Sequence, residues 1–343
     1  MRIVVVGATG AVGTEVLKIL EQRGHSHHEV VGVASARSAG RKLDFAGRTI
    51  VVEELGAGVF RDGDLAIFDV PDEVSAEWVP VATERGAVVI DKSAAWRMHE
   101  QVPLVVPEVN PEAVKDPPLG IIANPNCTTL AMVVPLAPLH RAAGLNRLVL
   151  ASYQAASGSG KPGIDELWDQ TELVVKEPEQ VREGLARDVL EGGSTFSQPI
   201  AMNVIPRCGS VKENGYTSEE LKLCHETRKI MGLPHLRVTA TCVRVPVMVG
   251  HSVAVHASFD RDISPDEARS LFDDAPGVVL RDDVADGVYP TPLEAAGRDA
   301  CYVGRIRQDP WEKNSLEMFC VADNLRKGAA LNAVQIAELL LGR

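Results

Sequence analysis

The stretch RIVVVGATGAVG at residues 2–13 indicates the fold of the first part of the chain. Its apolar run reads as a buried strand, three glycines follow, and apolar residues then recur at helical spacing over Ala11–Arg23. Small residues between a strand and a helix let the backbone approach a pyrophosphate, whose charge then lies at the helix N-terminus. The spacing is G-x-x-G-x-x-G, and Thr9 stands where the usual G-x-G-x-x-G motif has its second glycine. We predict dinucleotide binding, with a plain tight turn as the alternative. The predicted contacts are Gly7, Thr9, Gly10, Ala11 and Val12.

Short apolar runs alternate with amphipathic stretches through the first third of the chain. This rhythm is typical of βαβ units and predicts an α/β domain of Rossmann type with a parallel sheet. Its candidate strands are Arg2–Val6, Glu29–Ala34, Asp64–Val70, Ala87–Asp91 and Gly120–Ala123. Longer β-rich runs follow, and they predict an α+β domain with a mixed, largely antiparallel sheet. These runs are Arg147–Ala156, Val238–Val249, Ser252–Phe259, Ala300–Ile306 and Ser315–Asn324.

The length of 343 residues also suggests two domains. We predict that residues 1–126 form the dinucleotide-binding domain and that residues 127–324 form the second domain. The last segment, 325–343, contains an Ala/Leu-rich helix over Lys327–Leu341. We expect this helix to pack back on the first domain.

The composition is that of an ordinary soluble globular protein, with 45% apolar and 24% charged residues. The net charge of −12 argues against nucleic acid or an anionic membrane as the main partner. Apolar runs stay below the length of a membrane span, and the first residues lead into a strand with no cleavable-signal pattern, so we expect a cytoplasmic protein. The six cysteines show neither C-x-x-C pairs nor zinc spacing. We therefore expect mostly buried free thiols and no metal site.

The residues after the second strand indicate which dinucleotide is bound. NAD-binding domains usually place an Asp or Glu there for the ribose 2′-hydroxyl. This chain has Ser35, Ala36, Arg37 and Ser38 instead, with Arg41-Lys42 just beyond. A guanidinium and two hydroxyls suit a 2′-phosphate, which arginine can bind through two hydrogen bonds. We predict NADP through Ser35, Arg37 and Ser38, with a solvated basic loop as the alternative.

A cysteine in IIANPNCTTLAM at residues 121–132 is the candidate nucleophile. Pro125 disfavours helix at Asn124, and Asn126 is a good N-cap. Cys127 then falls in the first helical turn, where the helix dipole favours thiolate over thiol. The residues alone leave a nucleophile and a buried thiol open. A dinucleotide domain just upstream favours an enzyme that oxidises or reduces a carbonyl through a thioester.

Seven segments, taken together and in order over essentially the whole chain, resemble the aspartate-β-semialdehyde dehydrogenase family. They are GATGAVG, SARSAG, VPLVVPEVN at 102–110, NPNCTT, SYQAASGSG at 152–160, ATCVRVPVMVGHS at 240–252 and VGRIRQDP at 303–310. The resemblance implies reduction of aspartyl phosphate to aspartate semialdehyde, on the route to lysine, threonine and methionine. It also implies a homodimer or a higher homo-oligomer.

The resemblance assigns the chemical steps to three residues. Cys127 would attack the carbonyl of aspartyl phosphate, expel phosphate and hold the aspartyl group as a thioester, which NADPH then reduces. His251 would act as general acid and base, and a pKa near neutrality suits both directions. From the residue alone, a single histidine between two strands is better explained as a hydrogen-bonded core residue. Gln154 would orient the acyl intermediate.

Further residues would hold the substrate and the nicotinamide. Arg244 is a permanent charge in an apolar strand and therefore needs an anionic partner. The resemblance makes that partner the substrate's α-carboxylate. Glu219 and Lys222, which alone could be a solvated ion pair, would hold the α-ammonium and the phosphate. The other residues it implies are Arg97 with Lys222 for phosphate, Asn126 for substrate, and Ser157, Gly158 and Asn324 on the nicotinamide side.

The sequence departs from the family at two places. FDVPDEVS at 68–75 carries Pro71 and Asp72 where the family more often has a small Ser/Ala/Gly cofactor loop, which puts some cofactor contacts in doubt. Asn124 replaces a residue that is often a second cysteine, which should leave the nucleophile intact.

Three alternatives remain. N-acetyl-γ-glutamyl-phosphate reductase uses the same thioester logic, but its acetylated nitrogen has no charge for Glu219 to bind. Glyceraldehyde-3-phosphate dehydrogenase shares a Cys-Thr-Thr run, but Leu130 follows here and the acid typical of NAD binding is missing. A non-catalytic NADP-binding paralogue would not need both Cys127 and His251.

Overall fold

The computed structural model describes residues 1–342 and divides into two compact units. The first contains Met1–Leu130, His225–Pro234 and the C-terminal segment from Leu325. The second contains Ala131–Cys224 and His235–Asn324. Within the described residues, no helix is both long and apolar enough to cross a membrane.

The first unit is built on a six-stranded parallel sheet with the strand order β5-β2-β1-β6-β7-β8. Because β1 has β2 on one side and β6 on the other, the chain reverses direction across the sheet at β1, and ligands bind at such a switch point. The strands are β1 Arg2–Val6, β2 Glu29–Ala34, β5 Glu53–Glu54, β6 Leu65–Phe68, β7 Val88–Asp91 and β8 Ile121–Ala123. A small hairpin, β3 Lys42–Phe45 and β4 Arg48–Val51, accompanies them.

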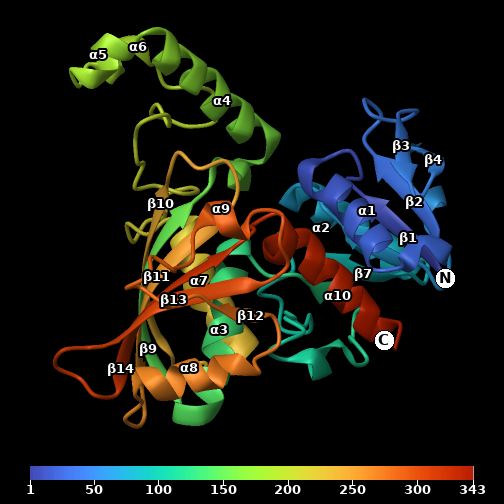
Figure 1. Cartoon of the computed structure of the whole chain (residues 1–343). Coiled ribbons are helices and arrows are strands. Elements are labelled where there is room, and N and C mark those ends of the chain that lie inside the picture. The colour runs from blue at the N-terminus through green and yellow to red at the C-terminus, as the bar shows by residue number, and fades with distance from the viewer. Residues whose placement is uncertain (343) are drawn as a thin grey trace. The chain divides into compact units, whose positions relative to one another are not determined.

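Helices cover this sheet and complete its core (Figure 1). They are α1 Ala11–Gln22, α2 Asp72–Glu84 and α10 Leu331–Leu340, the last preceded by one π-helical segment at Arg326–Ala330. Apolar side chains of α1 and α10, such as Val16 and Val334, lie in one buried cluster with Ile3 of β1. The predicted Rossmann-type domain is therefore confirmed.

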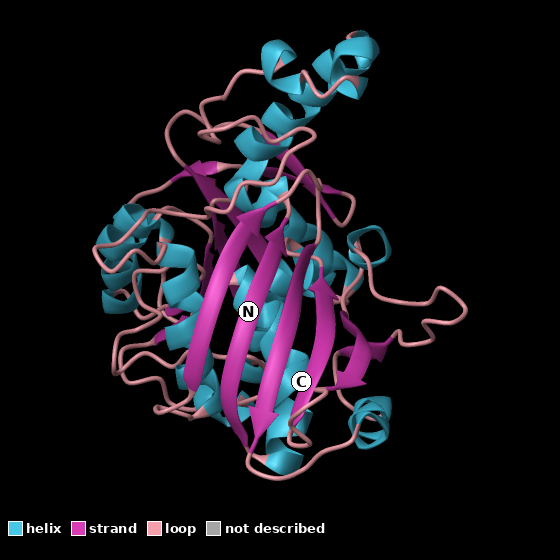
Figure 2. Ribbon diagram, turned by 90° about the vertical axis from the view of Figure 1, so that its left-hand side faces the viewer, coloured by secondary structure: helices cyan, strands magenta, loops and turns pink. Residues whose placement is uncertain are grey.

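The second unit contains a mixed sheet with the order β10-β9-β11-β14-β13-β12, whose long strands lie side by side in Figure 2. The β9–β11, β11–β14 and β14–β13 pairs are antiparallel, whereas β10 joins β9 and β12 joins β13 in parallel. This confirms the predicted mixed, largely antiparallel sheet. The strands are β9 Leu145–Gln154, β10 Arg237–Arg244, β11 His251–Phe259, β12 Val278–Leu280, β13 Cys301–Gln308 and β14 Ser315–Ala322.

The remaining helices follow or flank these strands. They are α3 Cys127–Ala143, α4 Gly160–Lys176, α5 Pro178–Arg182, α6 Ala186–Val189, α7 Ser218–Met231, α8 Pro265–Asp273 and α9 Pro292–Ala295. The sequence patterns did not predict α4 to α6. α4 has 17 residues but buries only Gly163, Leu167 and Gln170, and the short helices α5 and α6 have no buried residue.

One predicted strand was too long. Val238–Val249 was expected to be continuous, but β10 ends at Arg244. Pro246 lacks the N–H that would continue the ladder, and the chain turns before β11 begins at His251.

The segment 225–234 groups with the first unit, although the predicted division assigned it to the second. Lys229 explains this grouping. Its ammonium donates to the backbone carbonyls of Arg97, His99 and Val102 at 2.7, 2.8 and 2.7 Å. The C-terminal half of α7 thereby holds the loop that follows β7.

Candidate active site

The glycine loop after β1 leaves open backbone at the N-terminus of α1. Gly7 has φ +92°, and a Cβ there would lie 2.0 Å from the carbonyl oxygen of Asp69. A Cβ at Gly13 would lie 2.2 Å from the carbonyl oxygen of Gly7. No side chain caps α1, and its first turn has no acid. Glycine at 7 and 13 thus allows the loop to pack closely against Asp69 and α1 to pack closely against the loop. A helix N-terminus with neither a capping side chain nor an acid fits a pyrophosphate.

The end of β2 carries the predicted 2′-phosphate residues. Ser35 and Arg37 are exposed, whereas Ser38 is buried. The N–H of Ser38 donates to the carbonyl of Ser35 at 2.8 Å, so these residues form a tight turn. The turn presents the Arg37 guanidinium to solvent, where a 2′-phosphate could bind.

The unusual segment at 68–75 ends β6 and begins α2. Asp69 forms an ion pair with Lys92, with 2.8 Å between Oδ1 and Nζ. Asp72 opens α2, and its Oδ1 accepts the backbone N–H of Ala94 at 2.8 Å. Both acids therefore have partners, and the pairing with Lys92 offsets the charge that Asp69 places beside the glycine loop.

Cys127 is the first residue of α3, as predicted. The side-chain oxygen of Asn126 accepts the N–H groups of Thr128 and Thr129 at 2.9 and 3.2 Å, which confirms Asn126 as the N-cap. Cys127 is partly exposed, whereas the other five cysteines are buried. Burial raises the pKa of the Cys242 and Cys320 thiols. Position and exposure thus set Cys127 apart as the accessible thiol at a helix start.

Arg97 is buried and already engaged by three groups. Its Nη1 pairs with Glu226 Oε1 at 2.9 Å, its Nη2 donates to the carbonyl of Lys92 at 2.5 Å, and its Nε donates to the carbonyl of Asn124 at 3.0 Å. Arg97 was among the predicted site residues, whereas Glu226 was not. The available signal was helical spacing, since Glu226 follows Glu219 by two turns of α7.

In the second unit, the structure brings three predicted residues together. Gln154, buried at the end of β9, places its Nε2 at 3.4 Å from Oε1 of Glu219. The other carboxylate oxygen of Glu219 lies 3.3 Å from the Lys222 ammonium. Glu219 is buried and Lys222 is half-buried, so the pair is more enclosed than a solvated surface ion pair.

Arg244 and His251 meet at the loop that follows β9. Arg244 Nη1 donates to the carbonyl of Ala155 at 2.7 Å, and His251 Nδ1 accepts the N–H of the same residue at 3.0 Å. A Cβ at Gly158 would lie 2.6 Å from Arg244 Nη1 and 3.0 Å from His251 Nε2. Glycine at 158 therefore leaves room for both side chains.

His251 is fully buried, and its pKa lies well below the usual 6.5. The main cause is burial, and the positive charge of Arg244 adds to it. Among the described residues, Nε2 has no hydrogen-bond partner. A buried polar atom of this kind is uncommon in a core histidine and favours a ligand-facing role.

Ser157 and Asn324 form a tight pair in the second unit. Asn324 Nδ2 donates to Ser157 Oγ at 2.9 Å, and its Oδ1 accepts the N–H of Gly250 at 2.8 Å. Both residues are buried. In this arrangement Asn324 connects the turn at 157 to the start of β11.

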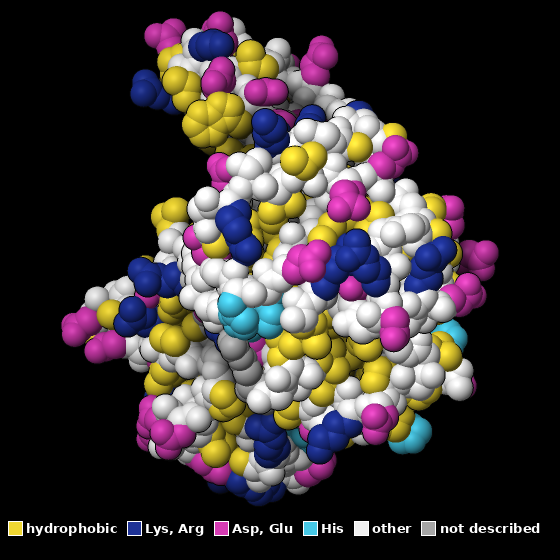
Figure 3. Space-filling model, turned by 90° about the vertical axis from the view of Figure 1, so that its right-hand side faces the viewer, with side chains coloured by type: hydrophobic (Ala, Val, Ile, Leu, Met, Phe, Trp, Pro, Cys, Tyr) yellow, Lys and Arg dark blue, Asp and Glu magenta, His cyan; other side chains and the backbone are white. Residues whose placement is uncertain are grey.

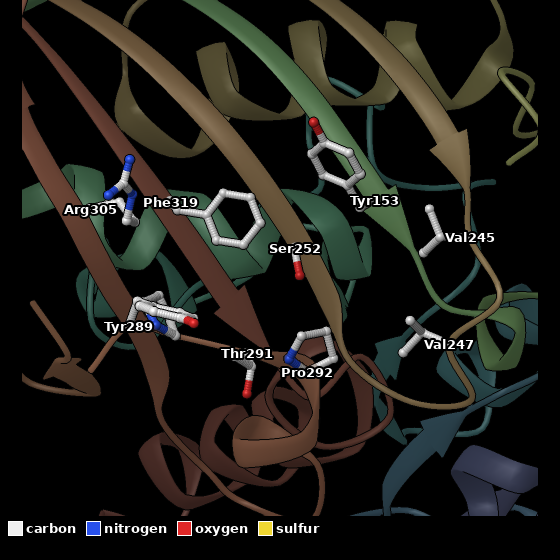
Figure 4. Close-up of a pocket in the computed structure, with 10 residues that line it drawn as sticks. Tyr153, Val245, Val247, Ser252, Tyr289, Thr291, Pro292, Arg305 and Phe319 are labelled. Atoms are coloured by element: carbon white, nitrogen blue, oxygen red, sulfur yellow. The ribbon is translucent and has the colours of Figure 1, made fainter. Parts of the chain in front are cut away.

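The exposed face of the mixed sheet contains an apolar hollow of about 630 Å³ (Figure 4). Tyr153, Ser252 and Phe319 come from β9, β11 and β14, and Tyr289 to Pro292 border it. Tyr153 and Gln154 are neighbours on β9 and point to opposite faces, since side chains alternate along a strand. The hollow therefore lies across the sheet from Gln154.

One group of possible metal ligands lies on the same sheet. His256, Asp309 and Glu317 have ligand atoms within 4.8 Å of one another. His256 Nδ1 already lies 2.8 Å from Glu317 Oε1, within hydrogen-bond distance. On the face of the molecule shown in Figure 3, acidic and basic side chains are interspersed and do not gather into one basic surface.

Two family models match successive parts of the chain. The model described as semialdehyde dehydrogenase, NAD binding domain, covers residues 2–117, and the one described as semialdehyde dehydrogenase, dimerisation domain, covers residues 136–327. The aspartate-semialdehyde dehydrogenase of Streptomyces akiyoshiensis is 51% identical, with 99% of this chain and 98% of that protein covered. The chain belongs to the aspartate-semialdehyde dehydrogenase family. The Aquifex aeolicus member of the family is 46% identical, with 99% of this chain and 98% of that protein covered.

A solved structure of the family has the same fold. Aspartate semialdehyde dehydrogenase II from Vibrio cholerae, complexed with ASA, superposes with a TM-score of 0.91 at 40% identity, covering 99% of this chain and 98% of that one. As a member of the aspartate-semialdehyde dehydrogenase family, the protein is an oxidoreductase of amino-acid biosynthesis with a nicotinamide dinucleotide cofactor.

Proposed function

We propose that the protein catalyses the reversible, NADP-dependent reductive dephosphorylation of L-aspartyl-4-phosphate to L-aspartate-4-semialdehyde. The reaction serves the synthesis of diaminopimelate, lysine, threonine and methionine. It proceeds through a thioester on Cys127, in the cytoplasm. The observation that carries the proposal is Cys127 itself, a partly exposed thiol at the start of a capped helix in a chain whose other cysteines are buried.

In the phosphorylating direction the Cys127 thiolate adds to the aldehyde carbon and forms a thiohemiacetal. NADP, held by the glycine loop, Ser35, Arg37 and Ser38 and on its nicotinamide side by Ser157, Gly158 and Asn324, supplies the hydride-transfer chemistry when bound. Oxidation leaves the aspartyl thioester, and a phosphate oxygen then attacks it, which breaks the C–S bond and restores the thiolate. The reverse sequence makes the semialdehyde.

We assign proton movement to His251 at Nε2. Because Nδ1 accepts the Ala155 N–H, the neutral ring carries its proton on Nε2. That N–H can donate to the oxygen of the reacting carbonyl as this oxygen gains negative charge. To take a proton as general base, Nε2 must be unprotonated, which requires the neutral ring to carry its proton on Nδ1 and to give up the Ala155 contact. Gln154 orients the acyl group, and Asn126 contacts the substrate near the thiol.

We assign each charged group of the substrate to a residue of opposite charge. Arg244 binds the α-carboxylate and Glu219 binds the α-ammonium, while Lys222 and Arg97 bind phosphate. In this proposal Cys127 supplies the thiol, and Arg244, Glu219 and His251 act on the substrate. The domains at 1–126 with 325–343 and at 127–324 would then supply cofactor binding and substrate recognition.

The direct test is phosphate-dependent reduction of NADP by the purified protein with aspartate semialdehyde. The N-acetylated glutamate semialdehyde serves as the comparison substrate. We expect turnover of the first and little of the second, since Glu219 has no charge to bind in an acetylated nitrogen. Preference for the acetylated substrate would favour the N-acetyl-γ-glutamyl-phosphate reductase reaction. Binding of NADP without turnover of either would favour a non-catalytic paralogue.

Arg37→Ala tests the choice of cofactor. We expect the KM for NADP to rise by roughly 10-fold or more, because a charge-assisted contact worth roughly 1.5–3 kcal/mol is lost. The KM for NAD should barely change, because NAD has no 2′-phosphate. Initial rates with both cofactors measure this. An equal change in the two KM values would mean that Arg37 shapes the turn and does not bind the phosphate.

Lys222→Ala and Arg244→Lys test the two anion sites against each other. Lys222→Ala should raise the KM for phosphate while the KM for semialdehyde stays nearly constant. Arg244→Lys keeps a charge but loses the planar fork, so semialdehyde KM and kcat should both suffer. A matrix of the two substrate concentrations for each variant separates these effects. If Lys222→Ala weakens semialdehyde and leaves phosphate untouched, the role assignment is wrong.

We also propose that the protein is a homodimer or a higher homo-oligomer, in which a second copy covers the exposed face of the mixed sheet. That face exposes Val149 and Tyr153 at 38% and 40%, and it carries the apolar hollow. Val149→Asp places a charge there and should dissociate the oligomer, as measured by light scattering after size exclusion. Val51→Asp, on exposed β4 of the first unit, is the control and should leave the mass unchanged. A Val149→Asp protein of wild-type mass would contradict this interface.

A further inference from the structure

Glu226 on α7 is a buried carboxylate that contacts two elements of the proposed catalytic machinery. Its side chain is only 1% exposed. Oε1 accepts a hydrogen bond from Arg97 Nη1 at 2.9 Å, and Oε2 accepts one from the backbone N–H of Asn126 at 2.7 Å. Asn126 is the N-cap of α3, and Cys127 follows it directly. One carboxylate thus fixes the arginine and the turn before the cysteine.

The same half of α7 holds the neighbouring backbone. Lys229, one helical turn after Glu226, donates to three carbonyls between Arg97 and Val102. Arg97 also donates to the carbonyls of Lys92 and Asn124, which follow β7 and β8. Its guanidinium is therefore held by the loops after both strands. A shift of Arg97 would break buried, charge-assisted hydrogen bonds. The guanidinium and the Glu226 carboxylate would then be buried without partners, which is costly.

We propose that Glu226 is a positioning residue that sets the Arg97 guanidinium relative to Cys127. The inference rests on the proposed function, in which Arg97 binds phosphate and Cys127 carries the acyl group. Phosphate attack on the thioester needs the anion held at a fixed place near the thioester carbon, because small misplacements of a reacting group cost large factors in rate. Glu226 supplies that reference point and does not itself touch substrate.

The chemistry of the two contacts requires a carboxylate. Both partners are donors, one a guanidinium N–H and the other a backbone N–H, and a carboxylate accepts on both oxygens. A glutamine has the same shape but one oxygen and one NH₂ group. Its NH₂ must face either Arg97 or Asn126, donor against donor, so one of the two contacts is lost.

The test is Glu226→Gln, assayed in the phosphorylating direction with phosphate and semialdehyde varied separately. We expect the KM for phosphate to rise by about 10-fold, because a charged hydrogen bond to Arg97 is lost. We expect kcat to fall by about 10-fold, because Arg97 no longer holds phosphate at the right place relative to Cys127. The KM for semialdehyde should stay within about twofold, since Arg244 and Glu219 do not contact Glu226. In an Arg97→Gln background, Glu226→Gln should add less than about twofold to the phosphate KM, because residues that act as one unit are not additive.

Glu220→Gln is the matched control on the same helix. Glu220 is also buried and also accepts two backbone N–H bonds, from Thr217 at 2.7 Å and from Cys242 at 3.0 Å. We expect it to leave the phosphate KM within twofold of wild type. If Glu226→Gln does not fold, Glu226→Asp, which keeps both oxygens on a shorter side chain, should show the same selective rise in phosphate KM.

The outcomes separate this inference from the proposed function. Wild-type protein without phosphate-dependent turnover would contradict the function itself. Active wild type with a Glu226→Gln variant whose two KM values are both unchanged, or rise together, would overturn the positioning role, as would full additivity with Arg97→Gln.

Discussion

Replacing Cys127 with alanine is expected to abolish turnover while NADP binding stays intact. The reaction forms and breaks a bond to this sulfur, and alanine offers no nucleophile. The glycine loop that we assign to the cofactor lies after β1 and does not depend on the thiol. Turnover is measured as phosphate-dependent NADP reduction, and binding is measured by calorimetry.

A short iodoacetamide pulse supplies the independent check. Cys127 is the partly exposed thiol at a helix start, and the other five cysteines are buried, so alkylation should concentrate on the peptide that contains Cys127. Labelling spread evenly over several cysteines would contradict the assignment of Cys127 as the nucleophile. Turnover of Cys127→Ala comparable to that of wild type would contradict it as well.

Replacing His251 with glutamine is expected to lower kcat by roughly 10²–10⁴-fold, the usual contribution of a positioned acid–base group. Glutamine preserves size and polarity but cannot exchange a proton. Binding of NADP and of semialdehyde should change far less than kcat. A variant that loses less than about threefold in kcat would show that His251 is a core residue.

The pH dependence of stability checks the environment of His251. Its pKa in the folded protein lies well below 6.5, because burial and Arg244 both disfavour the charged ring. The unfolded chain therefore binds a proton more readily, and His251 makes the fold less stable as pH falls below about 6.5. Above that range the ring is neutral in both states and contributes no pH dependence. Denaturant unfolding of wild type and His251→Gln between neutral and mildly acidic pH should show a shallower acid loss in the variant.

Local patterns were sufficient for the fold class but not for every element. The strand–glycine–helix junction at residues 2–13 and the apolar runs predicted both domain types, because hydrophobic period follows directly from element geometry. They failed where a single residue ended an element, as Pro246 does after β10, and where helices bury few residues, as α4 to α6 do.

The candidate site was predictable only where its chemistry is local. Asn-Pro-Asn-Cys carries its own helix start, so the cap on α3 could be predicted from four residues. The role of Glu226 could not be predicted, because it depends on a contact with Arg97, which lies 129 residues away in the sequence. Ser157 and Asn324 were placed together on the nicotinamide side only through the family resemblance, and the hydrogen bond between them, which spans 167 residues, was not predicted.

The proposed reaction depends on a thioester at Cys127, and this thioester can be trapped. The protein is mixed with aspartate semialdehyde and NADP in the absence of phosphate, quenched in acid and digested for mass spectrometry. Without phosphate to attack it, the acyl-enzyme should accumulate, and the peptide containing Cys127 should carry one aspartyl group that disappears when phosphate is added before the quench. An unmodified Cys127 peptide during active NADP reduction, or an aspartyl group on any of the other five cysteines, would contradict the account.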